Sequence, residues 1–165
     1  MRAALYVTIW ASMVALAASE WARRRGVRFG ALSPLALSAI GLAALVVHIA
    51  IAIVHHHGGD HAAAVAETAR LTEQVYGVAW GGGVYVNYAF VATWAAYVWW
   101  WRAHAEPLDN TNRRLLAIRA ALFVIVFNAL VVFASPSTRP LGVVLCLVLA
   151  WAWRPGRARA AVTTS

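Results

Sequence analysis

The feature that most constrains this chain is a succession of five long apolar segments that fill most of its 165 residues. The segments lie at 3–18, 32–54, 75–101, 115–134 and 141–153. A helix that crosses a lipid bilayer needs about 17–25 apolar residues. Soluble proteins carry about 25% charged residues, whereas this chain carries 12%. We therefore expect an all-α fold, a polytopic transmembrane helical bundle of four to five spans, in a single integral membrane domain over residues 1–165.

The apolar segments match the thickness of a bilayer to different degrees. The segments 32–54 and 115–134 have the usual length, whereas 75–101 has 27 residues and can tilt or project beyond the bilayer. The last segment, 141–153, forms a helix of only about 20 Å. It crosses only where the bilayer thins or where flanking arginines extend toward the surface, so the expected number of spans stays at four or five.

The first apolar segment has two interpretations, a retained helix or a cleaved secretory signal. The apolar stretch before Ala15-Leu16-Ala17 resembles a signal peptide over residues 1–17 with a small-residue cleavage site. Four arginines follow directly, at positions 23, 24, 25 and 28. A signal peptide would carry this cluster across the membrane, against the positive-inside tendency. We therefore expect a retained helix.

The distribution of arginine sets the expected orientation. The formal net charge is +8, and every basic residue is an arginine. Ten arginines follow the first, third and fifth apolar segments, and three, Arg2, Arg70 and Arg139, fall on the other side. Because basic residues concentrate in cytoplasmic loops, we expect the N-terminus outside and the C-terminus in the cytoplasm. The expected location is a bacterial-type inner membrane. Short groups of arginines between apolar segments are typical of membrane loops, so we expect a lipid bilayer as partner and no nucleic acid.

Several polar residues lie within or beside the apolar segments. We expect Asn87 and Asn128 to form a hydrogen bond across helices, because an unpaired amide is costly in a bilayer. His48 is either a functional titratable group or a neutral histidine bonded to a backbone carbonyl. We expect Glu20 to pair with the arginines that follow it and Arg119 to extend toward the cytoplasmic surface. Few other charges occur in the spans, which argues against an ion-coupled transporter.

Glycines at the start of the third apolar segment indicate close packing. Gly77 and Gly81 form a G-x-x-x-G pattern, and Gly81, Gly82 and Gly83 are consecutive. Small residues at this spacing allow membrane helices to approach closely. We therefore expect a helix-packing face at these four glycines, with a kink or a backbone-lined site as the alternative.

A histidine-rich outer loop over residues 55–74 is the most unusual feature of the chain. Its candidate metal ligands are His55, His56, His57, Asp60 and His61. Imidazoles and carboxylates suit a divalent transition metal such as zinc, iron or copper. Asp60 should also cap a short outer amphipathic helix that ends near Gln74. The alternatives are a solvated loop without a ligand, or a pH-sensitive proton relay.

The sequence contains no recognisable pair of nucleophile and base, and its single cysteine, Cys146, excludes an internal disulfide. We therefore do not expect an enzyme. The expected function is a non-catalytic subunit that packs in a larger membrane complex, against other membrane subunits or further copies of itself. The alternative is a metal-binding or metal-handling membrane protein whose site is the histidine-rich outer loop.

Overall fold

The computed structural model describes residues 2–103 and 112–154, and every regular element in these ranges is helical. The elements are α1 (Arg2–Arg25), α2 (Pro34–Ile51), η1 (Ala52–His56), α3 (His61–Tyr76), α4 (Gly83–Ala103), α5 (Arg113–Phe127), η2 (Asn128–Val132) and α6 (Arg139–Trp153). The two η elements are single π-helical turns that extend α2 and α5. The expected all-α class is confirmed for the described residues.

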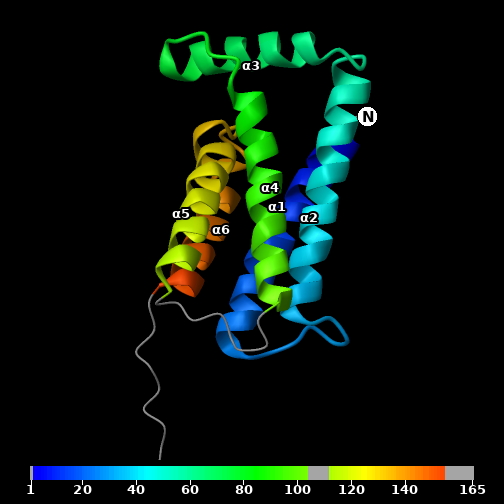
Figure 1. The fold of residues 1–165 in the computed structure, drawn as a ribbon. Helices are drawn as coiled ribbons and strands as arrows, with labels where there is room; N and C mark the ends of the chain where they lie inside the picture. Colours follow the sequence, from blue (N-terminus) through cyan, green and yellow to red (C-terminus); the bar gives the residue numbers. More distant parts are fainter. Residues whose placement is uncertain (1, 104–111, 155–165) are drawn as a thin grey trace, which may run out of the picture.

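Five helices form an elongated bundle, and the sixth lies across one end of it (Figure 1). Helix α1 contacts α2 and α6, α4 contacts α2 and α5, and α5 contacts α6, so the five helices close into a ring. Helix α3 crosses the end of the bundle at which α2 finishes and α4 begins (Figure 1). The opposite end carries the arginine clusters of the α1–α2 connection and of the start of α5.

Three helical stretches are long and apolar enough to cross a membrane: Ala3–Arg25, Pro34–His56 and Arg113–Val132. Helix α4 has 21 residues but is less apolar, because it contains tyrosines, tryptophans and an asparagine. Helix α6 is apolar but has only 15 residues, which is about 22 Å of helix. The fold therefore fits a membrane protein with three clear candidate spans, and a count of four or five is not confirmed.

The apolar segment 75–101 does not form one helix. Helix α3 continues to Tyr76, and Gly77 then ends it in the left-handed conformation, with φ 74°. A turn follows, and α4 begins only at Gly83. A glycine adopts this conformation without steric cost, so the glycines that suggested a packing face divide the segment between two helices that cross each other.

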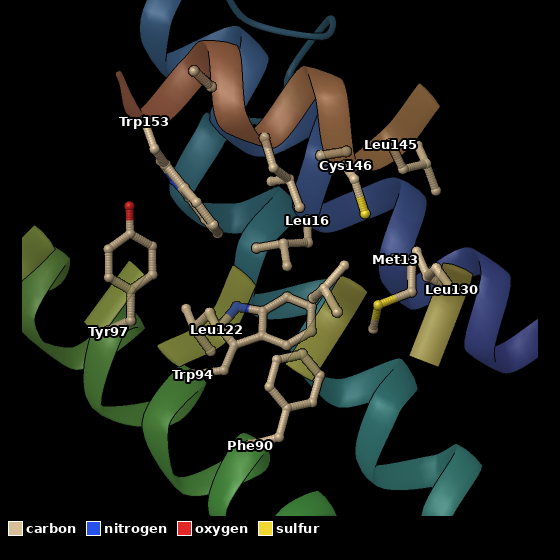
Figure 2. Packing of buried hydrophobic residues seen from close by; sticks show 14 of the residues in the cluster. Met13, Leu16, Phe90, Trp94, Tyr97, Leu122, Leu130, Leu145, Cys146 and Trp153 are labelled. Atoms are coloured by element: carbon tan, nitrogen blue, oxygen red, sulfur yellow. The ribbon is translucent and has the colours of Figure 1, made fainter. Parts of the chain in front are cut away.

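The core of the bundle surrounds the indole of Trp94 (Figure 2). Trp94 is fully buried and packs with Leu16 from α1 and Leu122 from α5. Its ring nitrogen donates a hydrogen bond to the hydroxyl of Ser38 on α2, at 3.0 Å. A Cβ atom at Gly41 would lie 3.0 Å from the same ring, so this glycine lets α2 approach α4 closely. The core thereby joins four helices around one aromatic residue.

Candidate functional site: a buried acid–arginine network

Four polar side chains form a connected group between α1, α4 and α5, which we call the Glu20 network: Glu20, Arg23, Tyr97 and Arg119. Glu20 and Tyr97 are fully buried, and Arg119 is 1% exposed. The hydroxyl of Tyr97 donates to Glu20 Oε1 at 2.7 Å, and Arg23 Nε donates to Glu20 Oε2 at 2.8 Å. The Nη2 and Nε atoms of Arg119 donate to the Tyr97 hydroxyl oxygen at 3.1 and 3.4 Å.

Helical periodicity places Arg119 in the network. Arg119 lies on the same stripe of α5 as the buried residues Leu115, Leu122 and Val126, at steps of three and four residues. Its guanidinium carbon also lies 5.6 Å from the centre of the Tyr97 ring, a distance at which a cation is attracted to the aromatic face. The expectation that Arg119 extends toward the surface is wrong, because its stripe faces the bundle interior and Tyr97 offers it an acceptor there.

Glu20 is a buried carboxylate on the core side of α1. It follows the core residues Leu16 and Ala17 at helical spacing, and it lies within the candidate span Ala3–Arg25. Its expected pairing with a following arginine is confirmed by the ion pair with Arg23. Arg23 also donates through Nη2 to the carbonyl of Ala152 on α6, at 3.3 Å, so the network reaches a fourth helix.

The network is arranged to join helices. Each oxygen of Glu20 accepts a hydrogen bond, and the Tyr97 hydroxyl both donates and accepts. Two guanidinium groups and one carboxylate leave the group with a formal charge of +1. Removal of one partner from a buried ion pair costs about 3–5 kcal/mol because the other charge stays buried. These contacts therefore tie α1, α4 and α5 into one orientation.

His48 connects α2 to α1 at the other end of the bundle. Its Nδ1 atom lies 3.1 Å from the carbonyl oxygen of Leu5 and 3.2 Å from the hydroxyl of Thr8. The Thr8 hydroxyl also donates to the carbonyl of Ala4 on its own helix. Of the two interpretations of His48, the structure provides the contact with a backbone carbonyl. This contact gives the polar ring a partner between the two apolar helices α1 and α2.

The histidine-rich segment is spread over three elements. His55 and His56 end η1 and His57 follows it, with the His56 and His57 rings 4.8 Å apart. Asp60 is the N-cap of α3, as expected, and accepts from the backbone N–H of residue 62 at 2.8 Å. His61 lies beside two tyrosines of α4, and its ring centre is 5.8 Å from that of Tyr85 and 6.0 Å from that of Tyr88. Among residues 2–103 and 112–154, no three histidine, cysteine or acidic side chains are gathered as metal ligands.

The two asparagines do not pair with each other. Asn128 accepts a hydrogen bond from the hydroxyl of Tyr76 at 2.5 Å and donates to the carbonyl of Val124 at 2.9 Å. Asn87 is exposed in the second turn of α4. Within the described part of the chain its side chain has no hydrogen-bond partner. The partner of Asn128 is a tyrosine at the end of α3, a contact that depends on how α3 crosses the bundle.

The glycines between α3 and α4 serve contact within the chain. Gly77 caps α3, whereas Gly81 and Gly82 lie in the turn and Gly83 opens α4. A Cβ atom at Gly81 would lie 2.5 Å from a methyl carbon of Val65 on α3, and one at Gly83 would meet the side chain of α3 residue 68. The close packing that we expected is therefore between this turn and α3.

A scan against protein-family models and searches of curated proteins and of solved structures find no match to this chain. Its function is therefore argued from the positions of its own residues. The two features that bear on function are the Glu20 network inside the bundle and the exposed amide of Asn87 on α4.

Proposed function

We propose that this chain is a non-catalytic subunit of a larger complex in the membrane, and that it packs there against other membrane subunits or further copies of itself. The observation that carries the proposal is the position of Asn87. Asn87 and the fully buried Trp94 are seven residues apart on α4, so they lie on nearly the same side of that helix. Trp94 packs into the core, whereas Asn87 is exposed.

An exposed amide beside an apolar core favours a partner helix. In a bilayer an amide without a hydrogen-bond partner is costly, and polar side chains of this kind hold membrane helices together. A helix of another subunit that packs against the half of α4 nearest α3 would supply both the missing hydrogen bond and apolar contact. The exposed Tyr85 and Trp80 lie near the same end of α4 and enlarge the surface that such a helix covers.

The Glu20 network supports a non-catalytic role. Both carboxylate oxygens of Glu20 accept hydrogen bonds from side chains of the same chain, and the contacts of the Tyr97 hydroxyl join α4 to α1 and α5. A general acid or base needs to reach a proton on its substrate, and the buried Glu20 is enclosed by its own partners instead. The network therefore gives the subunit a fixed shape that a partner can recognise.

The proposal places α4 and α6 across the membrane beside the three clear candidate spans. All five bundle helices run between the same two ends (Figure 1). The arginines at 23–25, 28, 102, 113–114 and 154 lie at the end opposite α3. By the positive-inside tendency that end is cytoplasmic, with α3 and the N-terminus outside, in an inner membrane. Arg157 and Arg159, which contributed to the same expectation, lie outside the described residues.

The metal-handling alternative requires three or more ligands in one place, and no such group occurs among residues 2–103 and 112–154. Asp60 is engaged as a helix cap and His61 lies against aromatic rings, so neither is directed toward the other histidines by these contacts. Metal analysis of the purified chain tests this alternative directly. Stoichiometric zinc, iron or copper that is lost when His56, His57 and His61 are replaced by alanine would favour it over the subunit role.

The proposed function is tested by the mass of the native assembly. The full chain is extracted with its own lipids into nanodiscs, and the particle mass is measured against the 17.8 kDa of one chain. We expect a stoichiometric complex that Asn87→Leu weakens and that Ala92→Leu leaves intact. Ala92 is the matched control because it is exposed on a different side of α4. A single copy of the chain without any protein partner would contradict the proposal.

A further inference from the structure

A groove of about 320 Å³ lies between α1 and α6 near the arginine-rich end of the bundle. Trp21 and Arg25 of α1 form one wall, and the other wall is a stripe of α6 formed by Val144, Leu147, Val148 and Trp151. The groove lies outside the Glu20 network and contains none of the side chains that form it. Its lining combines aromatic rings, a cation and aliphatic side chains.

Three guanidinium groups converge on the ring of Trp151. The guanidinium carbons of Arg25, Arg154 and Arg24 lie 5.3, 5.5 and 5.8 Å from the ring centre. Arg25 also lies 5.9 Å from the ring of Trp21. Arg24 further donates to the carbonyl of Arg154 at 3.2 Å, which holds the ends of α1 and α6 together. Arg24 and Arg25 thus bring two like charges to one ring, and because like charges repel each other, this pair favours an anion.

No carboxylate of the described residues neutralises the two arginines of α1 in this cluster. The ion pairs of the described chain join Arg23 to Glu20 and Arg70 to Glu67. Glu20, the acidic residue of this end of α1, is fully buried and engaged. Arg24 and Arg25 therefore present positive charge at the mouth of the groove, with aromatic rings beneath them.

The apolar wall continues from this charge toward the middle of α6. Leu147 is 64% exposed and Val144 is 53% exposed, although both belong to an apolar helix. From Trp151 to Val144 the helix rises about 10 Å. Tryptophan favours the level of lipid headgroups. The groove therefore has a cationic part at headgroup level and an aliphatic part that extends into the hydrocarbon region.

We propose that this groove binds one anionic phospholipid, with the phosphate at Arg24 and Arg25 and an acyl chain along Val144, Leu147 and Val148. Guanidinium groups bind phosphate oxygens through paired hydrogen bonds, and basic pockets between membrane helices are suited to anionic headgroups. An acidic protein segment would match the arginines but not the aliphatic stripe. The inference requires the chain to lie in a bilayer but does not require the subunit role.

The proposal is tested by lipid retention in native mass spectrometry of the full chain. The chain is exchanged into micelles with equal amounts of phosphatidylglycerol and phosphatidylcholine, and the lipid that stays bound is identified. We expect one bound phosphatidylglycerol, retained about 10-fold more than phosphatidylcholine. The double variant Arg24→Gln, Arg25→Gln should lose this preference. The control Arg113→Gln, Arg114→Gln removes the same charge from exposed positions of the same end and should keep it.

Two results would overturn the site. One is equal retention of both lipids by the unaltered chain, a result that does not depend on how any variant folds. The other is an equal loss of preference in both double variants, which would indicate a general effect of charge. A photoreactive amino acid at Leu147 gives an independent check in native membranes, because the site requires a lipid adduct there and a protein adduct would refute it. The subunit role is read from the number of protein chains in the particle, which the absence of one bound lipid does not alter, so failure of this site and failure of the subunit role are distinguishable.

Discussion

Replacement of Tyr97 by phenylalanine tests the Glu20 network with the smallest change in shape. The substitution removes one hydroxyl, which donates to Glu20 at 2.7 Å and accepts from Arg119 at 3.1 and 3.4 Å. Hydrogen bonds to charged groups contribute about 1.5–3 kcal/mol each, and both partners stay buried after the hydroxyl is lost. Glu20 keeps its bond from Arg23, so we expect the free energy of unfolding to fall by about 2–4 kcal/mol. This expected loss is larger than the contribution of a neutral hydrogen bond between membrane helices, which averages only about 0.6 kcal/mol.

The assay is equilibrium unfolding of the full chain in mixed micelles of mild detergent and sodium dodecyl sulfate, followed by tryptophan fluorescence. Trp94 is fully buried in the core, so its environment changes when the bundle opens. The control is Tyr85→Phe on the same helix, at a position that is 58% exposed, where we expect a change within about 0.5 kcal/mol. A loss at Tyr97 no larger than the loss at Tyr85 would refute the idea that the network holds the helices together.

Two further predictions concern the packing of α6 and the charges of α3. In Gly142→Ala the new Cβ atom would collide with the carbonyl oxygen of Leu130, so we expect a loss of about 1–3 kcal/mol in the same unfolding assay; an unchanged midpoint would show that η2 and α6 can move apart freely. On α3, the hydrogen bond from Arg70 holds the pKa of the partly exposed Glu67 below its usual value, so the contact is complete above the ordinary carboxyl pKa and is lost as the pH falls through the lowered one. Carboxyl NMR titration should show the pKa of Glu67 rise in Arg70→Gln, and the same pKa with and without Arg70 would contradict the pairing.

The helical class and several helix ends could be predicted from the sequence, because local rules decide them. The apolar segments 32–54 and 115–134 correspond to α2 with η1 and to α5 with η2, with small shifts at their ends. Asp60 caps α3 as its side-chain chemistry predicts. Local rules also predict a helix end within 75–101, since Gly77 is a typical helix C-cap. Because the residues on both sides of Gly77 are apolar, hydropathy alone indicated one continuous segment.

The buried network could be predicted only in part, because it depends on which helices are neighbours. The pairing of Glu20 with Arg23 is local, at a spacing of three residues. The position of Arg119 on the stripe of Leu115 and Leu122 was visible in the sequence, and it distinguishes a buried arginine from one that extends to the surface. Nothing local indicated Tyr97 as the bridge, because its role requires α4 to lie beside α5 and to direct this side chain toward α1.

The same limit explains the asparagines. The expectation for Asn87 and Asn128 assumed that both lie on facing sides of neighbouring helices. The crossing of α3 over the bundle instead brings Tyr76 to Asn128, and Asn87 is left exposed. A contact of this kind follows from the path of the chain after Gly77, which hydropathy alone does not determine.

The central claim is that lipid surrounds the apolar side chains that the fold leaves exposed, and cysteine labelling tests it most directly. In a Cys146→Ala background, Val124→Cys places a thiol on α5 at a position that is 58% exposed. A membrane-impermeant maleimide should leave it unlabelled in opened native membranes but label Arg28→Cys, which lies in the exposed α1–α2 connection. Denaturation in detergent should then make both thiols react. Labelling of Val124→Cys in native membranes as fast as that of Arg28→Cys would contradict the claim.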